Sequence, residues 1–204
     1  MRNGKFLLGI WMLLGLLSAG LQGQEDRPKP EISPKPLTSE QIAVYHAVLT
    51  EWIGHEHRSV NLQSLTDVAE PGGMSGYGNC AKKFKIETPS QTIHRFLATD
   101  AERLVPGGVV QLIDPRRGTA EVRANDPESS MRKGKSVDEA VENGFAHGLF
   151  SLSEIVFDEE HLHAIVSYGF VCGGLCGHGE TVVLEKVNGA WRRMKLQCGS
   201  SWIS

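Results

Sequence analysis

The sequence has no excess of positive charge and no second long apolar run. Its 204 residues carry 21 Lys and Arg against 24 Asp and Glu, which gives a net charge of −3. A mildly acidic chain without a basic face offers little to nucleic acid or to anionic lipid, so neither is expected as a partner. Because there is one apolar run, we expect no membrane span once that run has been removed.

Recognisable catalytic and phosphate-binding motifs are also missing. Residues 73–77 (GMSGY) fail the G-x-S-x-G pattern of a nucleophile elbow at its last position. Residues 107–108 (GG) precede a strand-like segment instead of opening a helix, which excludes a phosphate cradle. Residues 55–57 (HEH) lack the H-E-x-x-H spacing of a zinc protease. We therefore expect no catalytic residue and no cofactor, and the sequence favours a protein that is not an enzyme.

The single apolar run has the form of a secretory signal. Two basic residues precede the apolar residues 6–17, and the small residues 18–20 follow. A run of this length is shorter than the roughly 20 residues of a spanning helix, so cleavage is favoured over a retained anchor. We expect the cut after Gly20 or after Gly23, with residues 1–20 as the signal peptide. No cysteine lies near the cut, which disfavours a lipoprotein. The signal itself indicates an exported protein, either periplasmic or secreted.

A proline-rich segment separates this signal from the folded part. Residues 21–37 contain four prolines between positions 28 and 36, a spacing that predicts an extended, semi-rigid linker without helix or sheet. A proline-recognition motif is the alternative interpretation. The remaining residues 38–204 have the length of one domain with its own hydrophobic core.

The domain is expected to begin with a helix. Thr38 and Gln41 have the spacing of a capping box, apolar residues follow at helical intervals, and Gly54 is expected to end the helix. The elements expected after it are a strand (59–65), a loop (69–79), a short helix (89–104), a buried strand (109–113), a long polar surface excursion (114–135) and a helix capped by Ser136 and running towards Phe145.

The C-terminal part predicts a four-strand antiparallel meander. Its strands are expected at residues 153–157, 163–171, 180–186 and 190–198. Asn188-Gly189 is the strongest turn signal among them, because a type I′ hairpin needs two positive φ angles. Ala164, Val166, Tyr168, Phe170 and Cys172 share one face of their strand. That face should meet the N-terminal and middle helices, which gives an α+β fold with an antiparallel sheet.

Four cysteines, Cys80, Cys172, Cys176 and Cys198, form an even number, which favours disulfides in an exported chain. The expected hairpin register places Cys198 opposite about residue 179, and residue 179 opposite Cys172. Cys172 and Cys198 are then two strands apart, about 9.6 Å, which exceeds the roughly 7 Å limit between bridged Cα atoms. Cys172–Cys176 is the favoured pair because glycines let that turn fold back, and Cys80–Cys198 follows by elimination.

A zinc site is the alternative use of this end of the sheet. Its ligands would be Cys172, Cys176, His178 and Cys198, whose types suit tetrahedral zinc. The C-x₃-C-x-H spacing is uncommon, and an oxidising compartment converts such thiols to disulfides, so no metal is the favoured expectation. His161 and His163 have the spacing at which both rings project from one face of a strand. They lie at the opposite end of the hairpin and are therefore excluded from this site.

Residues 172–191 (CGGLCGHGETVVLEKVNGAW) and the final Trp202-Ile203-Ser204 resemble a family of uncharacterised exported bacterial proteins. Its members share a CGxLCGxG turn, a strand ending in Glu-Lys, a short hairpin with Trp and a Trp-Ile-Ser-like end. Residues 43–49 (AVYHAVL) also resemble the helix that opens those proteins. The resemblance implies the fold and the domain boundaries, and it implies no reaction.

Two functional hypotheses follow. The favoured one is an exported, non-enzymatic domain that binds a small molecule or an envelope or extracellular protein. Its binding surface would be the open face of the sheet or the excursion at 114–135. The alternative is a metal-binding protein, or a hydrolase whose site has no recognised motif.

Overall fold

The computed structural model describes residues 29–56, 59–70, 77–86, 91–199 and 201–204, so the expected signal and the first part of the linker lie outside it. Its helices are α1 (Ser39–Glu56), α2 (Gly78–Phe84), α3 (Ala98–Leu104), α4 (Pro115–Ala124), α5 (Pro127–Arg132) and α6 (Val137–Ala146). Its strands are β1 (Glu31–Ile32), β2 (Val60–Gln63), β3 (Thr92–Ile93), β4 (Val110–Ile113), β5 (Leu149–Leu152), β6 (Val156–Phe157), β7 (His163–Gly173), β8 (Cys176–Val187), β9 (Ala190–Gln197) and β10 (Trp202–Ile203).

Eight of these strands form one large sheet. Its order is β10-β8-β7-β5-β2-β4, with β6 paired to β7 and β9 paired to β8. Strand β2 pairs in parallel with β4 and β5, whereas the pairs that involve β7 and β8 are antiparallel. The expected mixture of helices with a mostly antiparallel sheet is therefore confirmed, and the parallel strands at one end are an addition to it.

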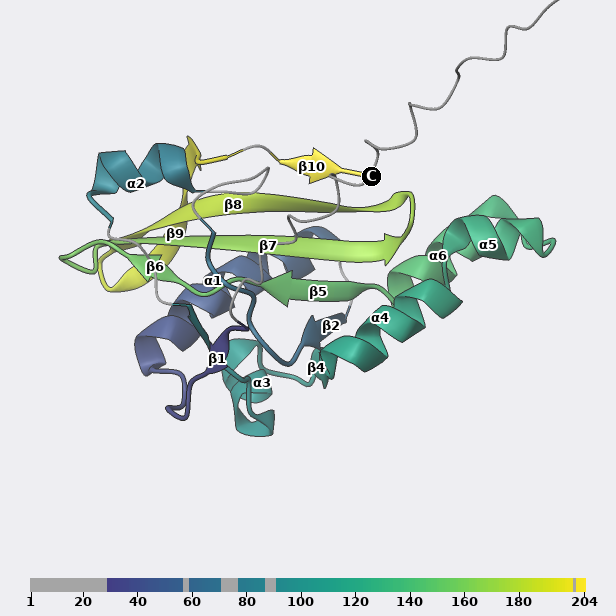
Figure 1. Cartoon of the computed structure of the whole chain (residues 1–204), viewed down its shortest axis with the longest axis horizontal. Helices are drawn as coiled ribbons and strands as arrows, with labels where there is room; N and C mark the ends of the chain where they lie inside the picture. The colour runs from purple at the N-terminus through teal and green to yellow at the C-terminus, as the bar shows by residue number, and fades with distance from the viewer. Residues whose placement is uncertain (1–28, 57–58, 71–76, 87–90, 200) are drawn as a thin grey trace, which may run out of the picture.

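Helix α1 covers one face of the sheet. It crosses behind the long strands in Figure 1, while α4, α5 and α6 lie beyond the end where β7 turns into β8. Between α1 and the sheet lies the main core, to which Tyr45, Leu49, Phe150 and Leu184 contribute fully buried side chains. The face of β7 that carries Ala164, Val166, Tyr168, Phe170 and Cys172 belongs to this core, as its alternation predicts.

The capping box of α1 is formed. The Gln41 N–H donates to Thr38 Oγ1 at 3.2 Å, and the Thr38 N–H donates to Gln41 Oε1 at 2.9 Å. The expectation that Gly54 ends the helix is wrong, since α1 continues to Glu56. One glycine in a helix costs about 1 kcal/mol, which the packing of the preceding turns offsets.

The expected polar excursion is two helices. Asp114 precedes Pro115 and accepts hydrogen bonds from the first N–H groups of α4. Asp126 precedes Pro127 and does the same for α5. An acidic N-cap followed by proline is a helix start, because the side chain satisfies free N–H groups and proline fixes a helical φ. These two Asp-Pro pairs are the signal that the interpretation of residues 114–135 as an excursion missed.

Two other expectations need correction. The loop expected at residues 69–79 ends earlier than expected, because α2 begins at Gly78. The linker is not free of sheet, because Glu31–Ile32 pairs in parallel with Thr92–Ile93. Pro30 and Pro34 lie on either side of the paired residues, so Glu31 and Ile32 keep the backbone N–H groups that a strand needs.

Strand register differs from the expectation at both hairpins. Asn188 and Gly189 have φ angles of 51° and 81°, as a type I′ turn requires. Register then shifts between Val182 and Leu184, so Gln197 pairs with Val182 and Cys198 falls near residue 181 instead of 179. At the other hairpin the turn places Gly173 opposite Cys176, and a further register shift between Val171 and Gly173 puts Gly179 opposite Gly169 instead of opposite Cys172. A count from the expected turn cannot include such shifts within a ladder.

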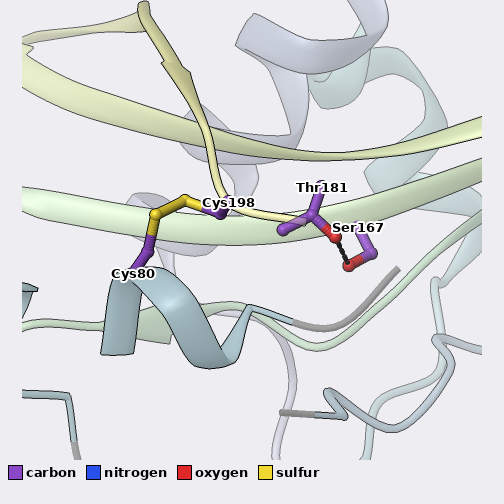
Figure 2. Close-up of a disulfide and its surroundings, with 4 residues drawn as sticks. All are labelled: Cys80, Ser167, Thr181 and Cys198. Carbon is purple, nitrogen blue, oxygen red and sulfur yellow. Dashed lines mark hydrogen bonds between the residues drawn. A yellow bond between two sulfur atoms is a disulfide. The ribbon is translucent and has the colours of Figure 1, made fainter. Parts of the chain in front are cut away.

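A disulfide joins α2 to the face of the sheet opposite α1. Cys80 is bonded to Cys198, and both are buried in a second apolar cluster with Ile165 and Val183. Figure 2 shows α2 held by this bond beside β7 and β8, where the hydroxyls of Ser167 and Thr181 are hydrogen-bonded at 2.6 Å. We call this side of the sheet the open face.

Candidate ligand groove

A groove of about 640 Å³ lies at the end of the sheet where β7 turns into β8. It runs between helices α5 and α6 on one side and β10 on the other, and we call it the end groove. Apolar side chains make up most of its lining: Pro127, Met131, Val141, Phe145, Phe170, Cys172, Leu175, Cys176, Trp202 and Ile203. The polar side chains at its margins are Asp126, Glu128, His178, Glu180, Ser201 and Ser204.

The floor of the end groove is aromatic and disulfide-bonded. The ring of Phe170 lies 5.3 Å from that of Phe145 on α6 and 5.1 Å from that of Trp52 on α1, centroid to centroid. Beside them Cys172 is bonded to Cys176 across the β7–β8 turn. This bond fixes the turn between two strands, so the floor is rigid before any ligand arrives.

Helices α5 and α6 form one wall, and a hydrogen bond attaches them to the turn. The Gly174 N–H donates to Asp126 Oδ2 at 2.7 Å, while Asp126 Oδ1 caps α5 through the Ser129 N–H at 2.8 Å. These two backbone donors hold the pKa of the Asp126 carboxyl below its usual value. One carboxylate therefore begins the helix and also fixes it against β7–β8.

The opposite wall rests on a patch of bare backbone. Trp202 lies over Gly169, Gly177 and Gly179, and a Cβ built on Gly179 would stand 2.2 Å from the indole Nε1. Cβ atoms on Gly177 and Gly169 would stand 3.3 and 3.6 Å from other indole atoms. Since the three positions meet different ring atoms, the indole lies flat across them. The CGxLCGxG segment and the C-terminal Trp-Ile-Ser are thus two halves of one structural unit.

Polar groups gather where the end groove meets α1. The ring of His178 lies 4.7 Å from that of Trp52. Next to it Glu180 accepts from Arg193, which also donates to Glu51 at 2.9 Å, and from the Tyr168 hydroxyl at 3.3 Å. Burial, followed by the charge of Glu180, raises the pKa of Tyr168 to about 12. Tyr168 is therefore a hydrogen-bond donor here at every physiological pH.

The structure does not assemble the alternative zinc site. Cys172 and Cys176 are bonded to each other at the end groove, and Cys198 is bonded to Cys80 on the open face. His178 lies near the first pair alone. In the part of the chain that the structure describes, no group of three or more His, Cys, Asp or Glu side chains is arranged to hold a metal ion.

The two histidines near the start of β7 contact different helices. His161 has a φ of 54° in the turn before the strand, and its Nδ1 lies 2.9 Å from Glu40 on α1. His163 pairs with Asp158 at 2.7 Å, and its ring lies 4.5 Å from that of Phe84 on α2, centroid to centroid. The expectation that both rings project from one face of a strand is wrong, because His161 lies in the turn and β7 begins at His163.

Sequence reasoning found one side of the groove and missed the other. The resemblance and the cysteine spacing both pointed to residues 172–180, which supply the floor and one rim. Met131 was missed because residues 114–135 were expected to be a surface excursion, and the helix expected from Ser136 towards Phe145 was not connected with a site. The missed signal was Asp126-Pro127, which predicts a helix that brings Met131 to the sheet.

Comparisons with protein-family models, curated proteins and solved structures find no match to this chain. None of the helices in the described ranges has the length and apolarity needed to cross a membrane.

Proposed function

We propose that this chain is an exported binding protein that holds a small apolar ligand in the end groove. The observation that carries the proposal is the combination of size and lining. At about 640 Å³ the groove falls within the roughly 300–1,000 Å³ of small-molecule sites, which are lined by apolar and aromatic side chains with a few placed polar groups. Binding rather than catalysis is proposed, because Glu180 is already engaged by Arg193 and Tyr168.

The position of the polar groups indicates the orientation of the ligand. Its apolar body would lie on Phe170 and the Cys172–Cys176 bond, between Met131 and Trp202. A polar head would lie at His178, whose ring has aromatic neighbours. This residue lines the end groove and also a smaller pocket beside Trp52 of α1. An acyl or aromatic molecule with an acidic or hydroxyl head has this chemistry.

Export and the resemblance support the same proposal. A secretory signal would place the domain in an oxidising compartment, where disulfides of the kind seen here persist. Residues of the CGxLCGxG segment and the C-terminal Trp-Ile-Ser line the end groove from two sides. The family resemblance is thus concentrated in the residues that would bind the ligand.

A fluorescent probe tests the groove directly. We expect 1-anilinonaphthalene-8-sulfonate, an aromatic anion, to bind the folded protein with enhanced emission. Val141→Glu places a charge in the apolar lining, and we expect it to weaken binding about tenfold or more. Val137→Glu is the matched control, because Val137 lies one turn earlier on the same helix, is more exposed (63% against 39%) and does not line the groove. The control should bind like the wild type.

Three outcomes count against the proposal. Equal weakening by both variants would mean that α6 is disturbed as a whole, and urea unfolding of each variant identifies that case. Unchanged binding by Val141→Glu would place the probe elsewhere. Binding of a partner protein that Val141→Glu abolishes, with no affinity for any small apolar probe, would replace the small ligand by a protein.

A further inference from the structure

A second pocket lies on the open face, away from α1. It has a volume of about 810 Å³ and is separated from the end groove by Trp202, which lines both. Its walls are partly apolar, with Leu65, Val68, Ile93 and Pro115 among the lining residues. Its floor is polar and includes Ser151, Ser153, Ser167 and the acidic side chain of Asp67. We call it the open-face pocket.

Asp67 is held rigidly at this floor. Its N–H donates to the carbonyl of Leu152 at 2.8 Å, and its carbonyl accepts from the Glu154 N–H at 2.7 Å. The carboxylate accepts from Gln63 Nε2 at 3.0 Å and from the Ser151 side chain. Backbone and side chain are therefore fixed from both neighbouring strands, and the carboxylate has one orientation towards the pocket.

In the described part of the open-face pocket, Asp67 is not accompanied by a basic side chain. Both side chains that donate to its carboxylate are neutral, and none of the described residues that line the pocket is Lys, Arg or His. Surrounding protein atoms raise the pKa of Asp67 above its usual value, although the hydrogen bonds from Gln63 and Ser151 oppose the shift. The residue is nevertheless exposed at the surface of the pocket, so a ligand can reach the carboxylate.

The same negative field acts on the buried side of the strand. Tyr45 of α1 donates its hydroxyl to the Ser153 carbonyl at 2.9 Å, and its ring is fully buried. After burial, the charges of Glu154 and Asp67 are the causes that raise the pKa of Tyr45 well above its usual value. Glu154 is paired with His94 at 2.9 Å, whereas the carboxylate of Asp67 takes its side-chain hydrogen bonds from neutral donors.

We infer that the open-face pocket binds a small organic cation, an ammonium group that pairs with Asp67 and lies against the indole of Trp202. A carboxylate supplies the counter-charge, and an aromatic face attracts a cation through its quadrupole, most strongly where water is excluded. The apolar walls suit the carbon substituents of an amine, and the floor hydroxyls suit a donor on the ligand. This inference does not depend on the end groove, since Val141 and Asp67 lie in different pockets.

Choline and its neutral isostere, 3,3-dimethyl-1-butanol, test the inference as a pair. They share shape and hydroxyl and differ in charge. We expect choline to shift the indole Nε1–H resonance of Trp202 in a saturable way, and the isostere to bind about tenfold or more weakly. Trp202→Phe identifies the resonance.

Asp67→Asn is the decisive variant. It keeps an acceptor for Gln63 and removes the charge, so choline binding should fall to the level of the isostere. Glu159→Gln is the matched control, because it removes one exposed negative charge outside the pocket and should leave binding unchanged.

The inference is overturned if choline and the isostere bind equally, or if Asp67→Asn keeps the affinity of the wild type. Preferential binding of glucose, a neutral ligand with several hydroxyls, would also overturn it. Equal losses in Asp67→Asn and Glu159→Gln would assign the binding to general charge attraction and also overturn it. Thermal unfolding of Asp67→Asn distinguishes a loss of binding from a loss of folding, and we expect the variant to be folded because its amide keeps an acceptor for Gln63.

Discussion

The two faces of the sheet differ in what covers them and in how the cover is attached. One face packs against α1, a helix of 18 residues whose buried side chains form the main core. The open face carries α2, a helix of seven residues held by the Cys80–Cys198 bond. A helix of seven residues is far below the length at which isolated helices become stable, so α2 depends on its attachment. Non-covalent contacts secure α1 on one face, and a covalent bond assists α2 on the other.

This difference explains why the two pockets have opposite chemistry. The end groove continues the apolar core past the last turn of α6, so it is lined by the same residue types as the core itself. The open-face pocket lies where α2 leaves the sheet uncovered, and there the strands present Ser151 and Ser167. Trp202 is the side chain that belongs to both.

Removing each disulfide separates the two modes of attachment and should give the largest effect. In the chain-entropy model, a link between residues 118 apart contributes about 5 kcal/mol, and one between residues four apart about 2 kcal/mol. We expect the double variant Cys80→Ala, Cys198→Ala to lose about 3 kcal/mol more than Cys172→Ala, Cys176→Ala. Urea unfolding gives both free energies. Equal losses would show that α2 needs no covalent attachment.

Gly179→Ala should have the next largest effect, because it acts on the wall that both pockets share. Its Cβ would overlap Trp202 and stand 2.8 Å from the Tyr168 carbonyl, so the indole must leave the glycine patch. Overpacking of this kind costs about 1–3 kcal/mol, and both probes should bind more weakly.

Gly54→Ala is the matched control for Gly179→Ala. A Cβ on Gly54 meets nothing within 4 Å, and the residue lies inside α1. This variant should stabilise the protein by about 0.5–1 kcal/mol and leave both probes unaffected. A stable Gly179→Ala with unchanged Trp202 fluorescence would mean that the indole does not rest on bare backbone.

How much of this could be predicted from the sequence depended on whether the signal was local. The capping box at Thr38, the Asn188-Gly189 turn and the alternation along β7 are local patterns, and the structure contains all three. The two disulfides in the structure are also the pairs that the sequence favoured, although the register used to reach them was wrong by two to three residues. A register shift within the ladder caused the error between β8 and β9, whereas between β7 and β8 the position of the turn caused most of it.

The pockets were the part that could not be predicted. Asp67 and Ser151 are 84 residues apart and become neighbours because β5 pairs with β7 and lies beside β2. The sequence contained the acid and the hydroxyl, and no spacing rule relates them. The sequence gives Trp202 only as part of the C-terminal Trp-Ile-Ser motif. The structure places its indole over three glycines, where it forms a wall of both pockets.

The smallest expected effects come from the two acids, and they should differ in sign. The pKa of Asp67 is raised mainly by burial, whereas hydrogen bonds from the Gly174 and Ser129 N–H groups lower that of Asp126. A raised pKa means that stability falls as the pH rises from the unfolded-state pKa to the folded-state pKa of Asp67, and the full cost remains at higher pH, so Asp67→Asn should be the more stable protein at neutral pH. A lowered pKa means that the carboxylate contributes stability above the unfolded-state pKa, near 3.8, so Asp126→Asn should be the less stable one.

Unfolding free energies measured from pH 3 upwards distinguish these effects from simple packing changes. The advantage of Asp67→Asn over the wild type should be absent below the usual carboxyl pKa and should grow as the pH rises through the folded-state value. The deficit of Asp126→Asn should shrink as the pH falls towards the lowered value. Both changes should be smaller than those of the disulfide variants, because both carboxylates border solvent and are partly screened. If the two variants followed the same pH trend, the surroundings of Asp67 and Asp126 would not differ in the way that the opposite shifts of their pKa values indicate.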